Sequence, residues 1–147
     1  MLEQIKLGGE YFDNDFGFFY EDLDVAWRAQ RHGFRGYYIP TAVAYHLRGF
    51  TARKGEGIDK PFARRFLSNE LHARLIRNRY LAMLKNESLS GFLLRLPFIF
   101  LYDCASLAFV LLFKRGVFNN FGGSLKCFKG SLERRRLIKI LLQQKTI

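Results

Sequence analysis

The stretch GGEYFDNDFGFFYEDLDVAWR, residues 8–28, decides how we expect this chain to fold and act. Five carboxylates stand just before an amphipathic segment and a sixth lies inside it: Glu10, Asp13, Asp15, Glu21, Asp22 and Asp24. Apolar residues recur at helical spacing over residues 21–32, and Gly33 is expected to end that helix. A helix N-terminus is partly positive and favours ionised carboxylates, so Asp22 is suited to act as a general base. Ordinary helix capping is the alternative explanation for an acidic first turn.

Charge divides the chain into two unequal parts. The 147 residues, enough for one ordinary domain, carry a formal charge of +11. Residues 1–50 hold five Lys/Arg and seven Asp/Glu, whereas residues 51–147 hold nineteen and six. The basic part indicates an anionic partner, either a membrane surface or nucleic acid. The two cysteines form no CxxC and indicate free thiols in a reducing compartment, and the N-terminus shows no signal-peptide pattern.

Two short strands and a long helix are predicted downstream of residue 33. The patterns at 36–39 and 42–46 are typical of strands around Pro40, and 49–57 is a polar boundary loop. Asp59 is expected to cap a helix that runs to about Lys85, before a turn at 86–91. Its apolar side is predicted to contain Phe62, Phe66, Ile76, Tyr80 and Met83.

Residues 92–113 form a largely apolar stretch that is long enough to cross a membrane. Arg95, Pro97 and Asp103 argue against a span, because an Asp near the bilayer centre costs roughly 2.5–3.5 kcal/mol. An interfacial or re-entrant helix, a soluble core helix and a true span all remain open. The tail that follows interleaves basic and apolar residues, which suits an anionic headgroup layer; a solvated amphipathic helix is the alternative.

The run from Gly8 to His46 resembles the acceptor-side half of family 2 glycosyltransferases, the rhamnosyltransferase-like group. The matching positions, in order and spacing, are Phe12, Asp13, Phe18, Tyr20, Glu21, Asp22, Asp24, Arg28, Gly33, Pro40, Tyr45 and His46. The resemblance implies an α/β GT-A fold, of which this chain holds the acceptor-side part. The implied domains are a catalytic part at 1–50, a linker loop with a long basic helix at 51–87, and a mostly helical, membrane-associating tail at 88–147.

The resemblance also implies roles for individual residues. Asp22 would deprotonate the acceptor hydroxyl, and Glu21 would be its neighbour in the acceptor pocket. His46 would be a ligand of a divalent metal, Mg²⁺ or Mn²⁺, at the donor diphosphate; a strand-end histidine bonded to backbone is the alternative. The residues expected to bind the acceptor or support the site are Asp13, Tyr20, Asp24 and Arg28.

The chain departs from the family pattern in three places, one of which is Arg48 with the basic loop after it, which has no fixed counterpart. Gly9 and Phe12 are two residues further apart than the pattern has, and the donor-binding half with its DxD metal motif has no counterpart. The strings Asp13–Asp15 and Asp22–Asp24 lie inside the acceptor-side pattern and follow no apolar strand. We therefore expect weak donor binding or none by this chain alone, with the remaining metal ligands supplied by the missing donor-binding half. A truncated gene product, a misannotated start and half of a split enzyme all remain open.

The expected function is that of an inverting glycosyltransferase, peripheral to the cytoplasmic face of a bacterial inner membrane. It would transfer a sugar from a nucleotide-sugar donor to a cell-surface polysaccharide or lipid-linked acceptor. The alternative is a non-catalytic basic module that binds an anionic membrane surface. Nucleic acid is not an expected partner, because no RRM, KH or zinc pattern is present.

Overall fold

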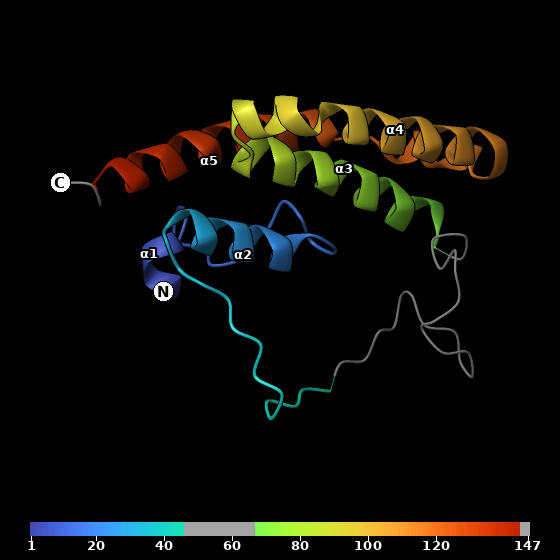
Figure 1. Ribbon diagram of the computed structural model, residues 1–147. Coiled ribbons are helices and arrows are strands. Elements are labelled where there is room, and N and C mark those ends of the chain that lie inside the picture. Colours follow the sequence, from blue (N-terminus) through green and yellow to red (C-terminus); the bar gives the residue numbers. More distant parts are fainter. Residues whose placement is uncertain (46–66, 145–147) are drawn as a thin grey trace.

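The computed structural model describes residues 1–45 and 67–144, and in these ranges the chain is a layered assembly of helices. The elements are α1 (Leu2–Ile5), α2 (Glu21–Arg31), α3 (Asn69–Asn86), α4 (Leu89–Phe113), the 3₁₀ helix η2 (Arg115–Asn120) and α5 (Ser124–Gln144). Figure 1 shows α3 between α4 on one side and α1 and α2 on the other. Helix α3 also packs against α5 and η2, so it is the centre of the fold.

The predicted α/β GT-A fold is wrong for the described part of the chain, which is all-helical and holds no strand. The nearest feature to a ladder is one isolated antiparallel bridge between Leu7 and Glu10. Residues 36–45, predicted to contain strands, lie largely open to solvent, with Tyr38 and Tyr45 89% and 99% exposed. A strand needs a neighbour to pair its backbone groups, and the described residues offer none to this segment.

Helix α2 begins and ends close to the predicted positions. Its last turn closes in a Schellman motif, in which Phe34 N–H donates to Ala29 O and Gly33 N–H donates to Gln30 O, both at 3.0 Å. Gly33 has φ +81°, a left-handed conformation that costs a side-chain-bearing residue free energy. The prediction that Gly33 ends this helix is therefore confirmed.

Helix α3 buries a different face from the one that its apolar residues predicted. Ser68 caps the described helix by accepting from Leu71 N–H at 3.2 Å, whereas Asp59 lies outside the described residues. The buried positions in its second half are Asn78, Leu81, Ala82, Lys85 and Asn86. Asn78, Leu81, Ala82 and Lys85 have the i, i+3, i+4, i+7 spacing of one helix face. This face is half polar because it packs against residues 10–20 before α2, which we call the acidic loop.

The hydrophobic core includes two small clusters that pack on different parts of α3. Phe16 of the acidic loop packs with Leu81 and Ala82, and Cys127 and Phe128 of α5 lie against them. At the other end of α3, Ala73 packs with Val110 of α4 and Val117 of η2. Through these two clusters the acidic loop and α4 pack on the same helix.

Candidate functional site

The turn that leads into α2 is backbone-strained. Phe19 and Tyr20 have φ angles of 71° and 69°, in the left-handed region that non-glycine residues rarely enter. Each such residue costs about 1–2 kcal/mol, so two in succession need support from the surrounding fold. Strain of this kind gathers at sites where a side chain must be held in one place.

Asn78 of α3 supplies that support. Its Nδ2 group donates to the carbonyls of Phe16 and Phe18, both at 2.7 Å, and to that of Phe19 at 3.0 Å. An amide NH₂ has two hydrogens, so one of them is shared between two carbonyls. Asn78 is fully buried, and its three hydrogen bonds join the start of α2 to the middle of α3.

The first turn of α2 presents two carboxylates without a cation beside them among the described residues. Asp22 is exposed, and its Oδ1 accepts from Leu23 N–H at 2.7 Å. Glu21 is partly buried, and its Oε2 is inaccessible to solvent and has no hydrogen-bond partner among the described residues. Both side chains stand at the helix start, where the free backbone N–H groups of α2 lie.

The supporting carboxylates Asp13 and Asp24 are instead neutralised in a buried network. Lys85 Nζ lies 2.7 Å from Asp13 Oδ2 and 2.8 Å from Asp24 Oδ1. Arg28 Nε donates to Asp24 Oδ2 at 3.0 Å, and Asn86 Nδ2 donates to Asp24 Oδ1 at 2.7 Å. Two carboxylates and two cations balance one another, which is the condition for burying charge at tolerable cost.

Arg28 and Arg134 tie this network to the rest of the chain. Arg28 donates to the backbone carbonyls of Ile5 and Tyr11 as well as to Asp24. Its guanidinium therefore joins α1, the acidic loop and α2. Arg134 of α5 pairs with Asp15 and lies 3.4 Å from Asp13. Burial opposes the charge of Arg134, but the neighbouring carboxylates outweigh it and raise the pKa of its guanidinium. The acidic loop is thus fastened by cations from α2, α3 and α5.

Asp22 lies in the wall of an open groove of about 1470 Å³. The groove runs along α2 and past the start of α4, and its walls include Phe12, Asp22, Leu23, Trp27, Phe34, Glu87, Arg95 and Ile99. Trp27 is the single tryptophan of the chain. Asp13, Asp24 and Arg28 do not line the groove and are buried. An ionised carboxylate between aromatic walls can accept a proton from a polar ligand held on those rings.

The structure therefore separates the predicted site residues into three sets. Asp22 and Glu21 lie together at the start of α2, after Tyr20 in the strained turn. Asp13, Asp24 and Arg28 meet in the buried network. His46 lies outside the described residues.

The described residues do not fit a divalent metal site. Within residues 1–45 and 67–144, no three His, Cys, Asp or Glu side chains converge as metal ligands. Asp13, Asp15 and Asp24 face lysine and arginine side chains that take up their charge. We therefore derive no step that passes through a metal.

Sequence reasoning missed the residues that hold the site from outside the acidic loop: Asn78, Lys85, Asn86 and Arg134. A signal was present, since Asn78 and Lys85 share a helix face with Leu81 and Ala82. A polar residue within a predicted buried stripe indicates a buried polar partner elsewhere in the chain. The sequence did not indicate that this partner is the acidic loop.

Comparison with protein-family models, with curated proteins and with solved structures gave no match.

Proposed function

We propose that this chain forms the acceptor-side part of an inverting glycosyltransferase, with Asp22 as the base. The observation that carries the proposal is the contrast between Asp22 and its neighbours. Asp13 and Asp24 are buried against Lys85, whereas Asp22 stands exposed in the groove at a helix start. The resemblance of residues 8–46 to the family 2 pattern points to the same assignment.

The proposed reaction is a single displacement at the anomeric carbon. Asp22 takes the proton from the acceptor hydroxyl as the oxygen attacks. The new bond joins that oxygen to the anomeric carbon, and the bond from this carbon to the nucleoside diphosphate breaks. Attack from the face opposite the leaving group inverts the anomeric configuration. In this proposal the donor is bound by a separate donor-binding half.

Aromatic walls suit a sugar acceptor. Phe12, Trp27 and Phe34 offer ring faces to the apolar side of a pyranose, and Arg95 and Glu87 offer polar contacts at the rim. The acceptor in this proposal is a cell-surface polysaccharide or a lipid-linked glycan, met at the cytoplasmic face of a bacterial inner membrane.

The test joins the chain to a donor-binding polypeptide, taken from the reading frame upstream of Met1 or from a neighbouring gene. Release of nucleoside diphosphate from a panel of nucleotide sugars is measured with and without a membrane glycolipid extract. Asp22→Asn should lower kcat by about 10²–10⁴-fold, the usual contribution of a general base. Glu133→Gln, which alters an exposed carboxylate of α5, is the matched control and should leave the rate unchanged. Full transfer by Asp22→Asn would show that another group is the base.

A second candidate function, a non-catalytic module for anionic membrane surfaces, is favoured by α4. This helix of 25 residues has a mean hydropathy of 2.1 in its most apolar window, and only 6% of that window is buried. An exposed apolar surface of this extent is typical of a docking site. Co-flotation with anionic vesicles that weakens as salt rises would support this function. Binding that depends neither on anionic lipid nor on salt concentration would remove its electrostatic basis.

A further inference from the structure

The two sides of α4 differ in charge. From Leu96 to Leu112 its exposed residues carry no charge, and many are large and apolar: Leu96, Phe98, Phe100, Leu101, Leu107, Leu111 and Leu112. Figure 1 shows α4 on the outside of α3, on the side away from α2. The outer side of α4 is therefore a continuous apolar face about five helical turns long.

The charged residues of α4 are both engaged by α3 or the loop that follows it. Asp103 pairs with Arg79 of α3, and Arg95 Nη1 lies 2.6 Å from Glu87 Oε2. The Arg79 guanidinium also lies 4.3 Å from the centre of the Tyr102 ring. Asp103, which argued against a membrane span in the sequence, is thus placed on the side that faces the protein.

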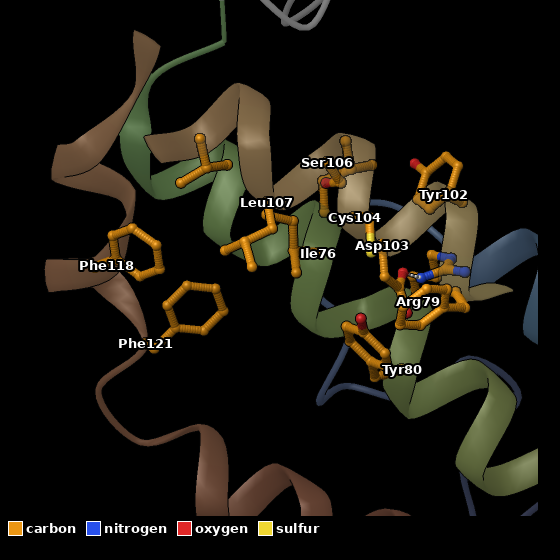
Figure 2. Close-up of a pocket in the computed structure, with 13 residues that line it drawn as sticks. Ile76, Arg79, Tyr80, Tyr102, Asp103, Cys104, Ser106, Leu107, Phe118 and Phe121 are labelled. Atoms are coloured by element: carbon orange, nitrogen blue, oxygen red, sulfur yellow. Dashed lines mark hydrogen bonds and ion pairs between the residues drawn. The ribbon is translucent and has the colours of Figure 1, made fainter. Parts of the chain in front are cut away.

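A few side-chain contacts join the second half of α4 to α3, and α4 also contacts η2. Val110 is buried with Ala73, and the rings of Phe109 and His72 have centroids 5.7 Å apart. Figure 2 shows the apolar pocket that lies along this contact, with Arg79 and Asp103 at one end and Phe118 and Phe121 at the other. Entry of α4 into a membrane core would either break these contacts and the Asp103–Arg79 ion pair or draw α3 in with it.

Helix α3 is unsuited to a membrane core. Its charged residues are Glu70, Arg74, Arg77, Arg79 and Lys85. Charged side chains at this density are excluded from hydrocarbon. The packing of α3 on α4 is compatible with a membrane only when α4 lies along the surface, with α3 above it on the aqueous side.

We infer that α4 lies flat in the interface of an anionic phospholipid bilayer, with its uncharged face toward the acyl chains. This inference deepens the second candidate function and rests on the membrane binding that it describes. The choice of an anionic bilayer follows from charge. Arg115, an exposed residue, follows the face directly at its C-terminal end, in a part of the chain (residues 51–147) with nineteen Lys/Arg against six Asp/Glu. Basic residues at the ends of an apolar helix reach anionic headgroups while the apolar face stays below them.

The orientation places the groove on the water side. Asp22 belongs to α2, and α3 separates α2 from α4 (Figure 1). The groove reaches α4 only near its start, through Arg95 and Ile99. A flat α4 therefore keeps the start of α2 close to the membrane surface and in water.

The test measures membrane depth at three points on the outer face. Nitroxide labels are placed singly at Leu94→Cys, Leu101→Cys and Leu112→Cys in a full chain carrying Cys104→Ser and Cys127→Ser. These leucines are 78%, 66% and 70% exposed, so labels there disturb little packing. Accessibility to oxygen and to a nickel chelate is measured by power-saturation EPR on vesicles of phosphatidylglycerol and phosphatidylcholine. A label at Gln30→Cys of α2, also exposed, is the control.

A flat helix gives three similar depths, about 5–10 Å below the phosphates, while the Gln30→Cys label stays in water. A depth at Leu101→Cys well below those at both other positions would show a span and overturn the inference, although membrane binding would stand. Water-like accessibility at all three positions would overturn membrane binding as well and favour a protein partner for this face. Vesicles of phosphatidylcholine alone should bind at least about tenfold more weakly; equal binding would remove the anionic lipid from the inference.

Discussion

Lys85 of α3 and Asp24 of α2 form a fully buried ion pair, with 2.8 Å between Lys85 Nζ and Asp24 Oδ1 and no exposure of either side chain. The same ammonium group lies 2.7 Å from Asp13 Oδ2. One lysine therefore fastens both the acidic loop and α2 to the central helix. The start of α2, where Asp22 stands, is positioned by a residue that belongs to the other half of the chain.

Replacing Lys85 by methionine should destabilise the fold strongly. The change keeps most of the side-chain volume but leaves Asp13 and Asp24 buried with Arg28 and Arg134 as their remaining cations. Removing one member of a buried ion pair costs about 3–5 kcal/mol. The free energy of unfolding is measured by urea denaturation followed by circular dichroism. Lys126→Met, at an exposed position of α5, should change it by less than about 0.5 kcal/mol. Equal midpoints for the two variants would contradict the buried network.

Asn78→Ala should loosen the turn before α2. The carbonyls of Phe16, Phe18 and Phe19 lose their common donor, at a cost of about 1–3 kcal/mol. The left-handed residues Phe19 and Tyr20 then lose their main support. Amide hydrogen exchange over residues 21–24 should therefore accelerate more than exchange in the middle of α5. Asn119→Ala, on an exposed residue of η2, is the control; a similar acceleration there would show that Asn78 has no special role.

Gly33→Ala should destabilise the end of α2, because alanine is disfavoured at φ +81°. The expected loss in unfolding free energy is about 1–2 kcal/mol, the cost of a left-handed conformation for a residue with Cβ. No atom lies within 4 Å of the added Cβ, so steric overlap makes no contribution. Gly36→Ala is a matched control without a positive φ and with the same open surroundings, and should be nearly neutral. A neutral Gly33→Ala would contradict the Schellman motif.

Trp27 should report ligand binding in the groove. It is the single tryptophan and lines the same groove as Asp22, so all tryptophan emission comes from this site. Oligosaccharides cut from the acceptor polysaccharide should shift or quench its fluorescence in a saturable manner, because a sugar stacked on the indole displaces water. Asp22→Asn should retain this response, because Asp22 is proposed to take the proton of the acceptor hydroxyl and the aromatic walls are proposed to bind the sugar. A response that is linear in ligand concentration would indicate nonspecific quenching and contradict an acceptor site here.

The sequence by itself determined the local features. The acidic first turn, the helix over 21–32 and its end at Gly33, and the continuous helix that contains 92–113 all follow from interactions between residues near one another in the chain. Capping, glycine conformation and apolar periodicity act over one or two helical turns, so the amino-acid order alone specifies them.

Only the tertiary structure decided the roles of the charged residues and the class of the fold. Six carboxylates within residues 10–24 are alike in sequence, and contacts with Lys85 and Arg134 divide them into buried supports and an exposed candidate base. The segments at 36–39 and 42–46 have strand composition, yet those of their residues that the structure describes pair with no strand, because pairing depends on neighbours that composition does not supply. Long-range partners fix both outcomes, since burial and backbone pairing depend on which segments meet in space.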